Sequence, residues 1–139
     1  MRNDKQNLIV EKSIEFSLKI IAYTQILDEN RKYVIAKQLL RSGTSIGANV
    51  FEAQNAESKA DFVHKMKLAA KEASETLYWL ILCEKSGSYN FDKTLKEDVE
   101  ELIRILSKII SSSKTGYRSY FIGLLLPLFS NLQIFKFSN

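Results

Sequence analysis

Apolar residues recur every three or four positions along most of the first 115 residues, which is the period of an α-helix with one buried face. The pattern predicts four helices, from about Asn7 to Asp28, from Arg31–Tyr33 to about Asn55, from Ser58 to Gly87, and from Asp92 to about residue 115. Turns of only a few residues separate them, so consecutive helices must fold back on one another. We therefore expect an all-α fold, an antiparallel up-down-up-down four-helix bundle.

Each predicted helix has its own candidate core face. In the first helix the candidates include Val10, Ile14, Leu18, Ile21 and Tyr23, and in the second they are Ile35, Leu39, Ile46, Val50 and Ala53. The third contributes Phe62, Met66, Ala69, Ala73, Leu77, Leu80 and Ile81, and the fourth contributes Leu95, Val99, Leu102, Leu106 and Ile109.

Residues typical of helix ends punctuate this pattern. Ser58 and Asp61 resemble a capping box at the start of the third helix, with Asp in place of the more usual Glu or Gln. Gly87 is placed to end that helix, because glycine readily adopts the left-handed conformation found after a last turn. Asp92 can cap the fourth helix, and Asp28 begins a predicted turn between the first two.

The stretch Gly43-Thr44-Ser45-Ile46-Gly47 lies inside the second predicted helix. A phosphate-binding P-loop needs a different glycine spacing, a following lysine and a preceding strand, and this stretch has none of them. The apolar repeat also keeps its helical phase through the two glycines. We therefore interpret Gly43 and Gly47 as a slim helix face that lets a neighbouring helix pack closely, and we predict no nucleotide site.

The end of the chain differs from the rest. Residues 116–139 are rich in aromatic and aliphatic residues and contain the one proline, Pro127. We predict a bundle domain over 1–115 and a hydrophobic C-terminal extension over 116–139. The extension either docks on its own bundle or on a neighbouring subunit, or it is a weakly structured apolar end. Its unbroken apolar run, from Tyr120 to Phe129, is about half the length of a membrane span, so we expect no membrane partner.

Composition adds few constraints. The net charge is +4, residues 41–87 carry balanced charge, and no segment forms a dense basic block, so the charge permits nucleic-acid contact without arguing for it. The lone Cys83 excludes an intramolecular disulfide and fits a reducing compartment. The first residues show no signal-peptide pattern. We expect a cytoplasmic protein.

The candidate chemistry is sparse. His64 is the only histidine, so the Glu-x-x-His pairs of a di-metal bundle site cannot be completed within one chain. Cys83 and the hydroxyl residues have no histidine at a suitable partner position. We therefore predict no catalytic residue, metal, cofactor or small-molecule substrate. One enzyme alternative stays open, a metal site built around His64, Glu72 and Glu75 at a symmetric subunit interface.

Polar residues on the second and third helices form a second candidate site. They are Arg41, Asn49, Glu52, Lys71, Glu72 and Glu75. Two interpretations stay open: a solvated surface, or a structural network or subunit contact in which Arg41 pairs with a carboxylate of the third helix. The neighbours Tyr78 and Trp79 point in different directions, so at most one of them faces the bundle centre.

Two blocks of sequence carry a specific resemblance: RSGTSIGANVFEAQNAESKADF at residues 41–62, and KEASETLYWL at residues 71–80. They resemble the bacterial four-helix bundle family named for proteins encoded in intervening sequences of 23S rRNA genes. The family is similar in fold to the accessory protein of diversity-generating retroelements, which binds nucleic acid and a reverse transcriptase. The resemblance covers about residues 5–115 and implies a ring-like homopentamer, but it transfers no functional residue. The chain from about Tyr117 onward has no counterpart in it.

These observations together predict a non-enzymatic, homo-oligomeric interaction module, expected to be a pentamer, with RNA or a ribonucleoprotein as its expected contact. The alternative is a purely structural protein–protein assembly factor with no nucleic-acid role.

Overall fold

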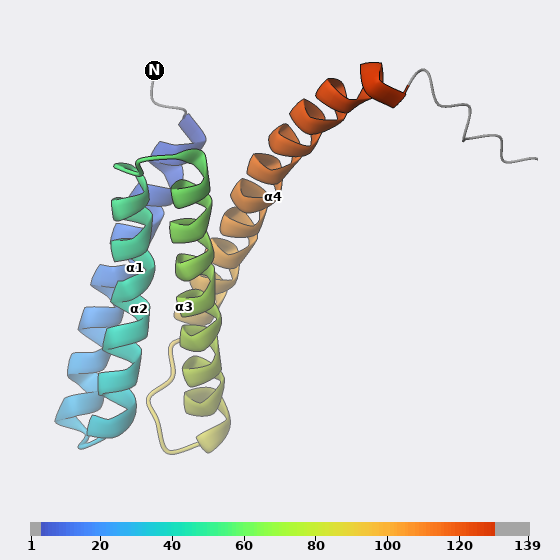
Figure 1. Ribbon diagram of the computed structural model, residues 1–139. Helices are drawn as coiled ribbons and strands as arrows, with labels where there is room; N and C mark the ends of the chain where they lie inside the picture. The colour runs from blue at the N-terminus through green and yellow to red at the C-terminus, as the bar shows by residue number, and fades with distance from the viewer. Residues whose placement is uncertain (1–3, 130–139) are drawn as a thin grey trace, which may run out of the picture.

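The computed structural model describes the backbone of residues 4–129 and the side chains of residues 8–114. The described backbone forms four helices and no strand: α1 (Asp4–Glu29), α2 (Tyr33–Ala53), α3 (Lys59–Ser86) and α4 (Lys93–Phe129) (Figure 1). The predicted all-α, four-helix fold is confirmed. The bounds of the first three helices agree with the sequence pattern to within a few residues, whereas α4 continues past the predicted end near residue 115.

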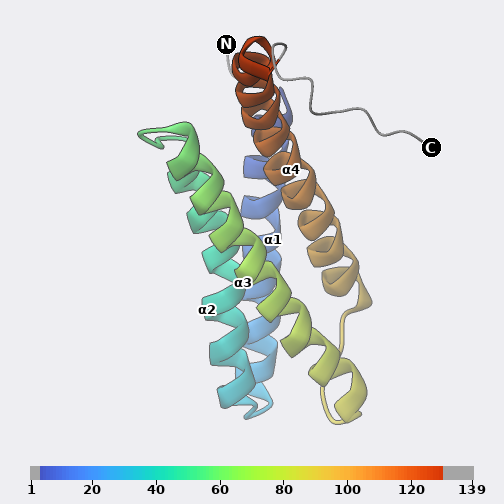
Figure 2. The same ribbon diagram turned by 45° about the vertical axis from the view of Figure 1, so that its right-hand side comes forward.

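The helices pack in a cycle, α1 on α2, α2 on α3, α3 on α4 and α4 back on α1. Ion pairs show the relative direction of α1 and α4. Lys12 Nζ lies 3.0 Å from Glu101 Oε2, and Lys19 Nζ lies 2.8 Å from Asp98 Oδ2. The later residue of α1 pairs with the earlier residue of α4, so the two helices are antiparallel. Figures 1 and 2 show the same opposed directions for each pair of consecutive helices.

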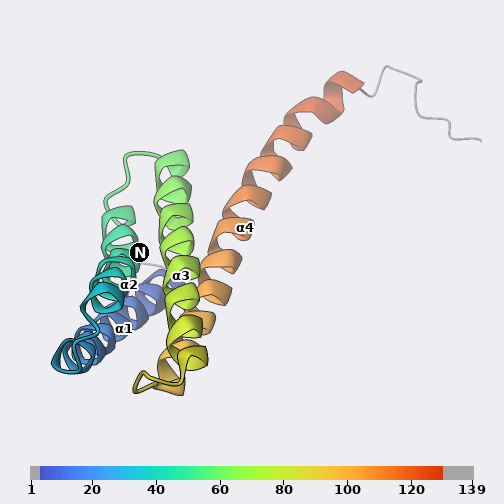
Figure 3. The ribbon, with the colours of Figure 1, turned by 90° about the horizontal axis from the view of Figure 1, so that it is seen from below.

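The second half of α4 leads away from the other three helices, which is clearest from below (Figure 3). Its backbone is helical across the predicted boundary between residues 115 and 116. Side chains from residue 115 onward, and residues 130–139 altogether, lie outside the described part. The predicted domain boundary and the predicted docking of the extension therefore stay predictions.

One apolar core occupies the space between the helices. The predicted core residues of α2, α3 and α4 are buried or packed against it, except Ile81 of α3, which is only half-buried. The buried hydrophobic residues are Ile9, Phe16, Ile20, Tyr23, Leu27, Ala36, Leu39, Ile46, Val50, Ala53, Met66, Ala69, Ala73, Leu80, Cys83, Leu95, Val99, Leu102 and Leu106. The helical period therefore identified the buried side correctly for three of the four helices.

The predicted core face of α1 is wrong for three of its residues. Ile14, Leu18 and Ile21 are 47%, 62% and 39% exposed, whereas Phe16 and Ile20 are buried. The cause lies in the sequence of α1, which has apolar residues on two opposite sides and so offers two stripes of helical period. Packing against α2 and α4 buries one stripe and leaves the other on the surface.

The predicted caps at both ends of α3 and at the start of α4 are confirmed. Ser58 Oγ accepts a hydrogen bond from Asp61 N at 3.0 Å, while the Asp61 carboxylate accepts one from Glu57 N rather than from Ser58 N. Gly87 ends α3 with φ +68°, the left-handed conformation. Asp92 Oδ1 accepts a hydrogen bond from Thr94 N at 2.9 Å and so caps the start of α4.

Candidate functional site

Close contact between α1 and α2 occurs where the two glycines lie. A Cβ atom built on Gly43 would be 2.9 Å from two side-chain carbons of Ile20. At Gly47 it would be 3.1 Å from Ser17 Oγ and 3.3 Å from the Ser13 carbonyl oxygen. Both glycines are buried, so the slim face of α2 is turned toward α1.

A buried hydrogen bond joins α2 and α3 next to this contact. Thr76 Oγ1 donates to Ser42 Oγ at 2.9 Å, and both residues are fully buried. Thr76 Oγ1 also lies 2.8 Å from the Glu72 carbonyl oxygen of its own helix. Buried hydroxyl groups are costly unless they are paired, so this contact helps to define the register of α2 on α3.

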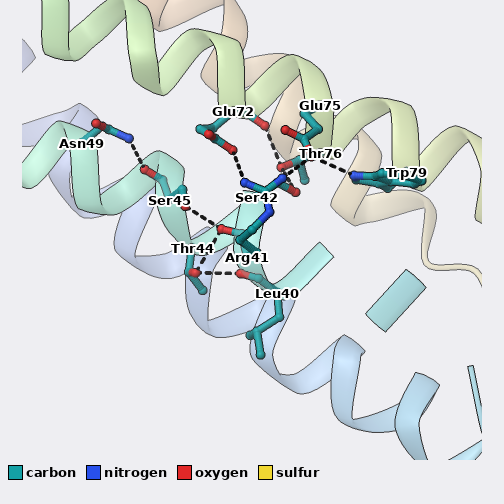
Figure 4. Close-up of polar contacts among 10 residues, drawn as sticks. All are labelled: Leu40, Arg41, Ser42, Thr44, Ser45, Asn49, Glu72, Glu75, Thr76 and Trp79. Atoms are coloured by element: carbon teal, nitrogen blue, oxygen red, sulfur yellow. Dashed lines mark hydrogen bonds and ion pairs between the residues drawn. The ribbon is translucent and has the colours of Figure 1, made fainter. Parts of the chain in front are cut away.

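Arg41 is the centre of the polar cluster on the α2–α3 surface (Figure 4). Its guanidinium contacts the Glu72 carboxylate, with Nη1 3.3 Å from Oε2, and also pairs with the Glu75 carboxylate. Trp79 Nε1 donates to Glu75 Oε1 at 3.3 Å. One arginine of α2 therefore spans two successive carboxylates on α3, with an indole N–H as a further donor.

The cluster is electrostatically matched and lies at the surface. The hydrogen bond from Arg41 holds the pKa of the Glu75 carboxyl group below its ordinary value, and the Trp79 N–H acts in the same direction. The Glu75 carboxylate in turn raises the pKa of Arg41. Because the Arg41 side chain is 49% exposed, water screens the pair, which links α2 to α3 at the surface.

The other three predicted cluster residues do not join this group. Glu52 Oε2 lies 2.7 Å from Lys65 Nζ, which makes a second α2–α3 ion pair. Asn49 Nδ2 donates to the Ser45 carbonyl oxygen of its own helix at 2.9 Å. Lys71 is exposed on α3 and makes no ion pair among the described residues, although its charge, after those of other groups, helps to lower the pKa of Glu75. The structure thus brings together Arg41, Glu72 and Glu75.

Trp79, rather than its neighbour Tyr78, faces the core. Trp79 is half-buried and packs against the core, while Tyr78 is 54% exposed. Their ring centroids are 5.1 Å apart in an edge-to-face arrangement. Tyr78 is therefore available on the surface.

Neither His64 nor Cys83 lies in a recognisable reactive arrangement. His64 is exposed, and Cys83 is buried, where loss of solvation raises the pKa of its thiol. Both are on α3, nineteen positions apart, which places them about 28 Å from each other. Within the described residues, no three His, Cys, Asp or Glu side chains are grouped so that they could hold a metal ion.

The sequence pattern did not predict an exposed apolar surface, here called the α1–α2 apolar face and defined by Ile14, Leu18, Ile21, Leu40 and Phe51. Leu40 and Phe51 are 41% and 60% exposed. The contacts of Gly43 with Ile20 and of Gly47 with Ser13 and Ser17 set Leu40 near the height of Ile21 and Phe51 within about one turn of Ile14. Leu18 lies on α1 between the heights of Ile14 and Ile21. The double apolar stripe of α1 is the sequence signal that could have identified it.

The outer side of α3 has the opposite character. Its exposed lysines Lys67, Lys71 and Lys85 define what we call the α3 lysine ridge, with Tyr78 among them. The glutamates of α3 point to its flanks, where Glu72 and Glu75 pair with Arg41, and Glu84 pairs with Lys96 at 2.6 Å. Ion pairing to neighbouring helices thus leaves the ridge positively charged.

A search of the described helices for a stretch long and apolar enough to cross a membrane finds none.

The fold and these surfaces define an all-α helical protein without a recognisable active site among its described residues. The family model for the 23S rRNA-intervening sequence protein matches residues 5–109, and the chain belongs to this family. It is not a known enzyme family. The resemblance seen in the sequence is thereby confirmed.

A solved structure supports the same assignment. A protein of unknown function from the S23 ribosomal protein family of Bacteroides thetaiotaomicron is 41% identical, and the match covers 77% of this chain and 98% of that chain with a TM-score of 0.73. No curated protein matches the sequence.

Proposed function

We propose that the protein is a non-enzymatic interaction module that assembles with copies of itself. The observation that carries the proposal is the α1–α2 apolar face, five large apolar side chains gathered on the side of the bundle that the core does not use. Covering such a surface removes apolar area from water, at roughly 25 cal/mol per Å². Contiguous exposed apolar patches on soluble proteins commonly mark interaction sites. The proposed assembly is a homopentamer, the state that the family resemblance implies.

Light scattering on the full chain tests self-association. A pentamer has five times the 16.0 kDa mass of the chain. Leu18→Asp places a charge on the apolar face, at its most exposed α1 residue, and should shift the mass toward the monomer. Val34→Asp is the matched control, because Val34 is 76% exposed on α2 but lies off the face. A monomeric wild-type chain at micromolar concentration would refute the proposal.

The second part of the proposal is that the assembly contacts RNA through the α3 lysine ridge. Lys67 and Lys85 are eighteen positions apart on one helix face, so the ridge is about 27 Å long, enough to follow several phosphates. The exposed Tyr78 ring offers a surface on which a base can stack. Repeating the ridge in an oligomer multiplies its charge.

Electrophoretic binding assays with structured RNA across a salt series test this part. Phosphate contacts release counterions, so affinity should fall steeply with salt. Lys67→Glu combined with Lys71→Glu should weaken binding at every salt concentration, whereas Lys37→Glu, on α2, should not. No binding at low salt would contradict the RNA part and favour the alternative, an assembly factor without a nucleic-acid role.

The non-enzymatic character rests on the arrangement of the reactive residues. The exposed His64 and the buried Cys83 are far apart on one helix, so they do not form a nucleophile–base pair. The carboxylates of Glu72 and Glu75 are engaged by Arg41. Elemental analysis of untagged protein tests the metal-enzyme alternative, and a stoichiometric transition metal would overturn our proposal.

A further inference from the structure

We propose that residues 117–129, the end of α4 in one copy, dock on the α1–α2 apolar face of a second copy. This inference rests on the proposed self-association and names the segment that covers the face. Three observations carry it: the chemistry of the face, the chemistry of the segment, and the direction in which α4 runs.

The face is apolar, and an acidic side chain, Glu11, borders it on α1. Lys12 and Lys19 of α1 point toward α4, where they pair with Glu101 and Asp98. Glu11 is exposed beside the stripe of Ile14 and Leu18, whereas the exposed Glu15 carboxylate lies 3.5 Å from Lys19 Nζ. A partner segment for this surface should therefore be apolar and cationic rather than acidic.

Residues 117–129 have that composition. Their sequence, YRSYFIGLLLPLF, contains aromatic and aliphatic residues and one charge, Arg118. No acidic residue occurs anywhere from 115 to 139. The segment also lies beyond residue 109, where the match to the family model ends, so it is an addition to the shared bundle.

The direction of α4 decides between its own face and that of a second copy. The ion pairs of α1 with α4 place the start of α1 at the height of about residue 111, so α4 continues about 27 Å beyond it. Figures 1 and 3 show this part leading away from the bundle. Within the described residues α4 does not contact α2, one of the two helices of the face. A continuous helix that leaves the bundle cannot return to that face, whereas it can reach a neighbour.

Photo-crosslinking in the full chain tests the inference. Leu125 is replaced by the photoreactive residue benzoylphenylalanine, and this protein is mixed with uniformly ¹⁵N-labelled wild-type chain before irradiation. We expect cross-linked peptides that join residues 117–129 to α1 or α2 and that combine the two isotopes. In the same experiment Leu18→Asp in the labelled chain should lower the yield by about tenfold or more, because a buried unpaired charge at an interface costs at least that factor. Val34→Asp should leave the yield unchanged.

Cross-links within one chain, cross-links to α3 or α4, or no cross-links would overturn the inference. Light scattering on the same samples separates the two proposals. If the wild-type chain is oligomeric but the mixed-isotope cross-links are missing, the docking of 117–129 is wrong and self-association stands. If the wild-type chain is monomeric, both are wrong.

Discussion

Gly43 determines how closely α1 and α2 approach at the residue scale. It is buried, and a Cβ atom there would be 2.9 Å from Ile20 carbons, closer than carbon atoms normally pack. The neighbouring Gly47 has more room, because its nearest atom is the Ser17 hydroxyl oxygen at 3.1 Å. A side chain at position 43 must therefore separate the helices.

Gly43→Leu should lower the free energy of unfolding by about 2–3 kcal/mol, because overpacking outweighs the gain in helix propensity. Ala48→Leu is the matched control, since Ala48 is exposed on the same helix and should change little. Urea denaturation of both variants measures the difference. Equal stability of Gly43→Leu and wild type would show that the close contact is absent.

Tyr23 shows a different kind of constraint. Its hydroxyl group is buried, and among the described residues it has no hydrogen-bond partner of normal geometry, although the Cys83 thiol is close enough to interact with it. Burial, with Cys83 as the next cause, raises the pKa of Tyr23. An unpaired buried hydroxyl destabilises a fold, whereas the ring contributes to the core.

Tyr23→Phe should therefore be neutral or should stabilise the protein by up to about 1 kcal/mol. Tyr23→Ala should cost about 3–5 kcal/mol, because it removes the ring as well. Thermal or urea denaturation measures both. A large loss of stability in Tyr23→Phe would mean that the hydroxyl group has a partner in solution.

At the scale of the elements, the turn between α1 and α2 contains a residue with a strained backbone conformation. Arg31 has φ 59°, and it is the one non-glycine residue with positive φ among those described. The turn closes with a hydrogen bond from Lys32 N to the Leu27 carbonyl oxygen at 2.8 Å. The left-handed conformation costs an L-residue about 1 kcal/mol, a cost that glycine avoids.

Arg31→Gly should raise the free energy of unfolding by about 0.5–1 kcal/mol, since relief of strain exceeds the extra entropy of the unfolded chain. Arg31→Ala removes the same side chain but keeps the Cβ atom, so it should bring no gain. Comparing the two by denaturation isolates the backbone effect. A gain in Arg31→Ala equal to that in Arg31→Gly would assign the effect to the arginine charge instead.

At the scale of the whole molecule, ion pairs connect helices around the cycle. Lys19 with Asp98 joins α1 to α4, Arg41 with Glu75 joins α2 to α3, and Lys96 with Glu84 joins α3 to α4. Helices α1 and α2 are held together instead by the close packing at Gly43 and Gly47. Ion pairs and close packing therefore both contribute to the register of the helices.

The stability of the protein should consequently decrease in acid. Since the pKa of Glu75 is lower in the folded protein than in the unfolded chain, its carboxylate stabilises the fold above its ordinary pKa of 4.5, and the contribution is lost as pH falls through the folded value. Glu75→Gln should thus be less stable than wild type near pH 7, and the difference should shrink toward about pH 3. Glu11→Gln, which breaks no ion pair seen in the described residues, is the control. A difference that is independent of pH would contradict the assignment.

Much of the fold follows from local pattern. The helix ends at Ser58, Gly87 and Asp92 were predictable because capping depends on neighbours a few residues away. The core faces of α2, α3 and α4 were predictable because each has one dominant apolar stripe. The candidate site was predictable only in part. Arg41 contacts Glu72 and Glu75 as expected, but Asn49 donates a hydrogen bond within its own helix and Lys71 is exposed. The difference arises because the exact rotation of each helix about its axis depends on the helices packed against it.

The sequence alone determined that four helices form and where they begin and end to within a few residues in most cases, because helical periodicity and capping are local properties. It also determined which family the chain resembles, through the two blocks at residues 41–62 and 71–80. Only the tertiary structure decided which of the two apolar stripes of α1 is buried, since both satisfy the same period and the choice depends on the surfaces of α2 and α4. That choice places Ile14, Leu18 and Ile21 outside the core. It turns a predicted core face into the surface through which we propose that the protein assembles.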